Sequence, residues 1–153
     1  MRIGIAQLNG TVGDLSGNLS LAVDAYEQLI AQNVDLIVYP ELFLSGYPPR
    51  DLLLKESFLT DVSEVLNQFA QQTGPVPALI GYPEADAEDH ASKKCFNSAA
   101  WCTNGKVSKI IDLYDYFVSG VYPNIYLRDQ DVILVEAYNK QVDAKKGFKT
   151  TAL

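Results

Sequence analysis

The sequence predicts an α/β fold organised around a mixed sheet. Two observations support this prediction. Short apolar runs alternate with two amphipathic helical segments, so the chain begins with a strand, a helix and a second strand. Further along, an Asn-Gly pair separates two more apolar runs. The first pattern is typical of parallel strands joined by a right-handed crossover, and the second of an antiparallel hairpin, so one sheet should contain both.

The first predicted unit is a strand, a helix and a strand. Residues 2–8 form a short apolar, β-branched run, and turn residues follow it at Asn9-Gly10 and Gly13-Asp14. We expect Asn18 to cap the helix that follows. Residues 35–39 are a continuous apolar run, as in strands buried on both faces. The apolar positions of the helix recur every 3.6 residues and are Leu19, Ala22, Val23, Tyr26, Leu29 and Ile30.

A loop rich in proline and glycine, residues 40–49, separates this unit from a second predicted helix. That helix should end at Thr73-Gly74-Pro75, and a third strand should follow at residues 78–82. Residues 85–94 are polar and are expected to form a solvated loop. The apolar face of the helix comprises Phe58, Leu59, Val62, Val65, Leu66 and Phe69.

The next segment predicts a β-hairpin. Cys95–Cys102 and Val107–Ile111 are apolar runs on either side of an Asn-Gly turn, the strongest short-range signal for a hairpin. We assign residues 1–111 to one unit and residues 112–153 to a divergent C-terminal segment whose architecture the pattern does not define. Within that segment Asp131–Val135 could form a strand.

Composition limits the functional classes. The chain has 153 residues, 48% of them hydrophobic and 20% charged, which fits one folded domain. Its formal net charge of −7 argues against nucleic acid or an anionic membrane as a partner. Two cysteines and one histidine do not support a disulfide scaffold or a metal site rich in these residues. Without a secretory or membrane-spanning pattern, the expected location is the cytoplasm.

Glu41 is the sharpest candidate for catalysis. It follows the predicted strand 35–39 and Pro40, where open α/β sheets bind ligands beyond the carboxyl ends of their strands. Its apolar neighbours should remove water from the carboxylate, which favours a role as general base. The alternative is a structural carboxylate that caps the next turn.

Tyr47 is the second candidate. It lies in Gly46-Tyr47-Pro48-Pro49, and two prolines stiffen the loop, which would then present the phenol to a polar substrate. The alternative is an ordinary aromatic residue packed in a turn.

Cys95 follows two lysines, a setting that can activate a thiolate. Alternation along a strand puts it on the face of Asn97, Ala99 and Trp101, and these small and apolar neighbours favour a buried, inert thiol. Cys102 lies seven residues later, so the two thiols should face opposite ways and should not form a disulfide.

Four segments together resemble a known family. They are MRIGIAQLNGTVGDLSGNL, DLIVYPELFLSGYPPRDLL, ALIGYPE and FNSAAWCTNGKVSKI, in this order. The combination resembles the nitrilase (carbon–nitrogen hydrolase) superfamily and, within it, the N-terminal glutaminase domains of glutamine-dependent NAD synthetases. The resemblance covers about the first 111 residues.

The resemblance implies an αββα sandwich and a catalytic triad of Glu, Lys and Cys. Glu41 matches the general base that activates the cysteine, which forms a thioester with glutamine, and Tyr47 matches a position that lines the glutamine pocket. The lysine would help to hold the developing oxyanion and the incoming water. ATP and deamido-NAD would belong to a separate synthetase domain, so no cofactor and no metal are expected in this chain.

The chain departs from the family pattern after Ile111. The family continues into a segment with the catalytic lysine, whereas residues 112–120 contain no lysine, and no cysteine follows Cys102. We therefore expect a partial nitrilase-like sandwich, inactive alone, whose apolar face and unpaired strand edges favour self-association or a completing protein partner. The alternatives are a non-catalytic glutamine-binding or regulatory module, and a hydrolase completed by another chain.

Overall fold

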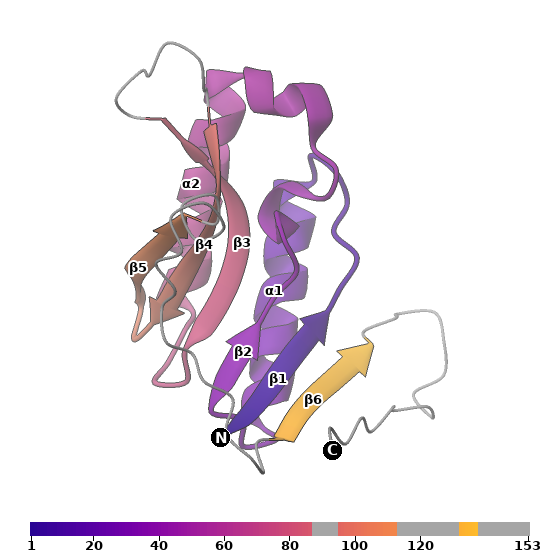
Figure 1. The fold of residues 1–153 in the computed structure, drawn as a ribbon, viewed down its shortest axis with the longest axis vertical. Coiled ribbons are helices and arrows are strands. Elements are labelled where there is room, and N and C mark those ends of the chain that lie inside the picture. Colours follow the sequence, from indigo (N-terminus) through magenta and orange to yellow (C-terminus); the bar gives the residue numbers. More distant parts are fainter. Residues whose placement is uncertain (87–94, 113–131, 138–153) are drawn as a thin grey trace.

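The computed structural model describes residues 1–86, 95–112 and 132–137, which form a six-stranded sheet with helices on one face (Figure 1). The strand order is β5-β4-β3-β2-β1-β6. β1 pairs in parallel with β2 and β6, and β2 with β3, whereas β4 pairs antiparallel with β3 and β5. The predicted mixed α/β sheet is thus confirmed. The elements are β1 (Arg2–Gln7), α1 (Leu15–Ile30), β2 (Leu36–Val38), the 3₁₀ helices η1 (Phe43–Ser45) and η2 (Arg50–Leu54), α2 (Glu56–Gln71), β3 (Ala78–Ala85), β4 (Cys95–Thr103), β5 (Lys106–Asp112) and β6 (Val132–Ala137).

The core lies between the sheet and the two helices, α1 and α2. Aromatic rings join the layers: Tyr39, which follows β2, meets Phe69 of α2 edge-on with ring centroids 5.3 Å apart. The Tyr39 hydroxyl donates a 2.7 Å hydrogen bond to the carbonyl of Ala22 in α1, so the buried phenol is satisfied. The largest fully buried side chains in this part of the chain include Phe43, Phe69, Leu29, Ile37, Leu44, Ile80 and Val62.

The predicted cap of α1 is wrong. The helix begins at Leu15, and the carboxylate of Asp14 accepts a 3.0 Å hydrogen bond from the amide of Gly17. Asn18 lies inside the helix and is fully buried. Both residue types are good caps, and the apolar period does not locate the first turn, so the sequence pattern could not choose between them.

The buried Asn18 side chain connects three segments. Its Oδ1 accepts a hydrogen bond from the Thr11 amide at 2.8 Å, and its Nδ2 donates to the Thr11 carbonyl at 2.9 Å. Nδ2 also donates to the carbonyl of Leu44 at 3.1 Å. The segment after β1 and the loop after β2 are therefore both fastened to α1.

The second helix and the hairpin agree with the prediction. The buried face of α2 contains Phe58, Leu59, Val62, Leu66 and Phe69, as expected, together with Ala70. Asn104 and Gly105 have φ values of 52° and 77°, the left-handed conformation that a tight Asn-Gly hairpin turn requires. Their amides donate to the carbonyls of Gly74 and Thr73, which dock the turn against the segment after α2. β3 extends beyond the predicted strand to Ala85, and residues 87–94 of the predicted polar loop lie outside the described residues.

Part of the divergent C-terminal segment joins the sheet. β6 includes the predicted strand residues 132–135 and pairs with β1 from Arg2 opposite Val132 to Gln7 opposite Ala137. The edge of the described sheet is therefore β6 rather than β1. Residues 113–131 and 138–153 lie outside the described residues. In the part of the chain that is described, no helix has the length and apolar character needed to cross a bilayer.

Replacing Asn18 by alanine should strongly destabilise the fold. The substitution leaves the amide and carbonyl of Thr11 and the carbonyl of Leu44 without their partner. We expect the free energy of unfolding to fall by about 3 kcal/mol, measured by urea denaturation. Ser20→Ala is the matched control, because it removes one exposed hydrogen bond in the same helix and should change stability by less than about 0.5 kcal/mol. Equal effects of the two substitutions would contradict this account.

Candidate functional site

Glu41 lies beyond the carboxyl end of β2, as predicted, but its side chain is exposed. The residues that follow it, Leu42, Phe43 and Leu44, are buried in the core. Leu42 adopts a left-handed φ of 50°, so the chain turns sharply directly after Glu41. The expected desolvation is therefore wrong, because the apolar neighbours in sequence pack into the core rather than around the carboxylate.

Two glycines allow the loop that carries Glu41 to pack closely against neighbouring backbone. A Cβ at Gly81 in β3 would come within 2.7 Å of the Leu42 nitrogen and 2.9 Å of the Glu41 Cα. At the other end of the loop, Gly46 has a φ of +74°, and its Cβ would lie 2.6 Å from the Thr11 carbonyl oxygen. Side chains at either position would push the loop away, so the glycines allow the close packing that positions Glu41.

Asn97 of β4 contacts the carboxylate directly. Its Nδ2 donates a 2.5 Å hydrogen bond to Oε1 of Glu41. The β3–β4 register brings it there, with Gly81 opposite Ala99 and Pro83 opposite Asn97. Strand alternation predicts that Asn97 lies on the face of Cys95, but the sequence pattern does not connect Asn97 with Glu41. Strand alternation was the available signal, and the missing information was the register between β3 and β4.

Tyr47 is 63% exposed and lies in the same loop, seven residues after Pro40. Within the described residues, no hydrogen bond or ring contact joins it to Glu41. The phenol is therefore accessible rather than packed in the turn, and its part in binding glutamine remains a prediction.

Neither cysteine is arranged as an activated nucleophile in the described structure. Both are free; Cys102 is fully buried in the core beside the helices, whereas Cys95 is partly exposed. Burial raises the pKa of the Cys102 thiol to about 12 and also raises the pKa of Cys95. Both thiols are thus protonated near neutral pH, as expected for inert cysteines. The lysines before Cys95 lie outside the described residues.

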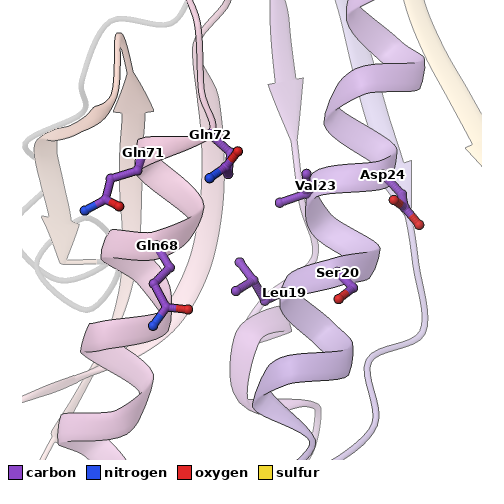
Figure 2. A pocket seen from close by; sticks show the side chains of 7 residues that line it. All are labelled: Leu19, Ser20, Val23, Asp24, Gln68, Gln71 and Gln72. Carbon is purple, nitrogen blue, oxygen red and sulfur yellow. The ribbon is translucent and has the colours of Figure 1, made fainter.

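A hollow of about 400 Å³ lies elsewhere, between α1 and the end of α2 (Figure 2). Leu19 and Val23, two of the predicted apolar positions of the helix, are partly buried and line it together with Ser20 and Asp24 on the α1 side. Gln68, Gln71 and Gln72 line the α2 side. Neither Glu41 nor Tyr47 contributes to this hollow. In the described part of the chain, no three His, Cys, Asp or Glu residues are grouped to hold a metal ion.

Gly81→Ala should disturb the loop that carries Glu41. The new methyl group would meet backbone atoms of residues 40–42, which cannot rotate away as a side chain does. We expect the free energy of unfolding to fall by about 2 kcal/mol in urea denaturation. Gly74→Ala is the control, because its Cβ would meet only the Tyr26 hydroxyl at 3.7 Å. A Gly81→Ala protein as stable as the control would show that the loop is not closely packed.

The buried Cys102 thiol should make the fold sensitive to alkaline pH. Its pKa is about 12 in the folded chain, against 9.0 as the ordinary value, so the folded state retains the proton more tightly. This contribution is fully present below pH 9 and is lost as the pH rises towards 12. Between pH 7 and pH 10, the native chain should lose about 1 kcal/mol more stability than Cys102→Ala, measured by urea denaturation. Parallel stability curves would contradict the assignment.

Comparison with known proteins extends these observations. A sequence model of the carbon–nitrogen hydrolase family matches residues 2–115. The glutamine-dependent NAD(+) synthetase of Thermotoga maritima is 40% identical over 109 residues, which are 70% of this chain and 18% of that protein. The structure of a glutamine-dependent NAD(+) synthetase from Cytophaga hutchinsonii matches with a TM-score of 0.64 and 27% identity, over 71% of this chain and 18% of that one.

An amidase from Nesterenkonia sp. matches with a TM-score of 0.57 and 20% identity, over 72% of this chain and 41% of the amidase, which shows a shared fold alone. The chain spans less than a fifth of the Thermotoga maritima synthetase. The family match covers most of the chain, and the mixed sheet agrees with the fold of the similar structures. The chain therefore belongs to the carbon–nitrogen hydrolase family, and its homology is to the glutaminase domain of glutamine-dependent NAD synthetases.

Proposed function

We propose that the chain carries the general-base side of a glutamine-hydrolysing site and that it is inactive alone. The observation that carries this proposal is the exposed Glu41 carboxylate, held beyond the carboxyl end of β2 by close backbone packing against Gly81. The similar proteins are glutamine-dependent NAD(+) synthetases, which supports glutamine as the substrate. Glutamine is thus the proposed ligand of the completed site, with Tyr47 as a proposed contact.

The proposed chemistry needs groups that the described residues do not bring to Glu41. In amide hydrolysis through a covalent intermediate, a base takes the proton of a thiol, and the sulfur attacks the amide carbon. The nitrogen leaves as ammonia, and water then releases glutamate from the thioester. Cys102 is in the helix-side core, and no hydrogen bond joins Cys95 to Glu41 among the described residues. A thiol and a lysine from a completing partner are therefore part of the proposal.

We do not propose for this chain the NAD(+) synthesis for which the relatives are named. We propose that ATP and deamido-NAD bind to a synthetase domain rather than to these residues, so the chain itself needs no cofactor. The cytoplasm remains the proposed location. Self-association is the alternative to a completing partner, because a second copy would also cover the face of the sheet opposite the helices.

Glutamine hydrolysis is the direct test. The purified chain should release no ammonia from glutamine above the rate of a protein-free blank, and Glu41→Gln should behave identically. The reason is that an unassisted carboxylate has no nucleophile to activate. Saturable release that disappears in Glu41→Gln would contradict inactivity and would show that the chain, or an assembly of its copies, completes the site.

The exposure of both Glu41 and Tyr47 supports a second candidate, a non-catalytic glutamine-binding module. Thermal unfolding with increasing L-glutamine separates the two, since a ligand that binds only the folded state raises the midpoint temperature. A saturable rise that is absent with D-glutamine and lost in Tyr47→Ala would favour the binding module. An unchanged midpoint would favour the incomplete hydrolase.

A further inference from the structure

We propose that Asn97 is a positioning residue for Glu41: it holds one carboxylate oxygen and leaves the other to accept a proton. This inference rests on the proposed function, because it assigns a role within the same site. Nδ2 of Asn97 donates to Oε1 at 2.5 Å, whereas Oε2 accepts no hydrogen bond within the described residues. The two carboxylate oxygens of Glu41 therefore differ in their hydrogen bonding to the described residues: Oε1 has a donor and Oε2 has none.

Both partners of this contact are attached to ordered backbone. Asn97 lies on β4, which is paired on both sides, with β3 and with β5. Glu41 follows a strand end, and its Cα is packed against Gly81 of β3. An amide that donates to a carboxylate makes a charge-assisted hydrogen bond, which is stronger and more directional than a neutral one. The contact therefore selects one orientation of a side chain that is otherwise exposed.

A nearby pair shows what a structural contact looks like in this sheet. Ser98, next along β4, donates a 2.7 Å hydrogen bond to Oε2 of Glu84 in β3. That bond joins two adjacent strands and supports their pairing. Asn97 instead reaches a loop residue 56 positions earlier in the chain.

The Oδ1 atom of the Asn97 amide also indicates a functional site rather than a purely structural hydrogen bond. Its Oδ1 is buried, yet it accepts no hydrogen bond from the described part of the chain. Turning the amide over would place Oδ1 against the negatively charged carboxylate, so the orientation with Nδ2 towards Glu41 is favoured. Buried acceptors usually have a partner, so an orphaned one that adjoins a proposed base is more consistent with a functional group than with packing.

The positioning has a clear chemical consequence. A general base works when the accepting oxygen is already aimed at the proton to be removed, because no reorganisation is then needed during the reaction. With Oε1 occupied by Asn97, the accepting atom of Glu41 is Oε2. Without Asn97, the exposed side chain would rotate among several orientations.

Side-chain NMR of the full, isotope-labelled chain tests the inference without requiring activity. In the native chain, the Nδ2 proton of Asn97 that faces Glu41 should exchange with water at least about tenfold more slowly than that of a free asparagine. Glu41→Gln should remove most of this protection, because it replaces the charged acceptor by a neutral one. Asn97→Ala should shift the carboxyl carbon of Glu41, with backbone changes confined to residues 40–42 and the substituted position.

Ser98→Ala and Glu84→Gln are matched controls, because they alter the neighbouring hydrogen bond, which joins β4 to β3 and does not involve Glu41. Both should leave the Asn97 protons and the Glu41 carboxyl signal unchanged. Should Glu41→Gln fail to fold, Glu41→Asp shortens the side chain and should likewise speed the exchange. Fast exchange in the native chain, or an unchanged rate in a folded Glu41 variant, would overturn the inference. So would an Asn97→Ala protein whose β3 and β4 signals move while the Glu41 carboxyl does not.

These outcomes separate the inference from the proposed function. Saturable glutamine hydrolysis by the chain alone, together with a protected Asn97 amide, would overturn the proposed inactivity and leave the positioning inference standing. An unprotected amide in a chain that releases no ammonia from glutamine would overturn the positioning inference and leave the proposed function standing.

Discussion

The position of the candidate site depends on the buried amide of Asn18. By binding both backbone groups of Thr11 and the carbonyl of Leu44, this side chain brings the segment after β1 against the loop after β2. Close backbone contact follows, and Gly46 accommodates it at one end of the loop as Gly81 does at the other. A loop held in this way on several sides has few alternative conformations, so Glu41 has a defined place although its side chain is exposed. Asn18, the polar residue of α1 in the core, thus helps to fix the position of Glu41, the candidate base.

The alternation of strand side chains separates the chemistry of the two sheet faces. Ala100 and Cys102 belong to the core beside the helices, whereas Asn97, at a position of opposite alternation to Ala100, meets Glu41. On the helix side, burial raises the pKa of Cys102, and this thiol serves packing. On the other side, the carboxylate and the amide form a polar pair at the end of the strands. The protein therefore places its most buried thiol and its candidate base where they do not meet, which is the physical basis for proposing that a completing partner supplies the nucleophile.

Several elements were predictable because local rules determine them. The Asn-Gly turn requires two residues with positive φ, and Asn104 and Gly105 supply them. The apolar period of α2 describes a helix with one buried face, and five of its six predicted residues are buried. The cap of α1 was not predictable in the same way, because Asp14 and Asn18 are both suitable and the choice depends on the contacts of Thr11 and Leu44.

By itself, the sequence determined the order of strands and helices, the mixed sheet, the family to which the chain belongs and the identity of Glu41 as the candidate base. These properties follow from patterns within short segments. Only the tertiary structure decided that Glu41 is exposed, that Gly81 lies against its backbone and that Asn97 binds its carboxylate. The contacts of Glu41 with Gly81 and with Asn97 both join residues that are tens of positions apart in the sequence. They arise from strand register and backbone packing, which no local periodicity specifies.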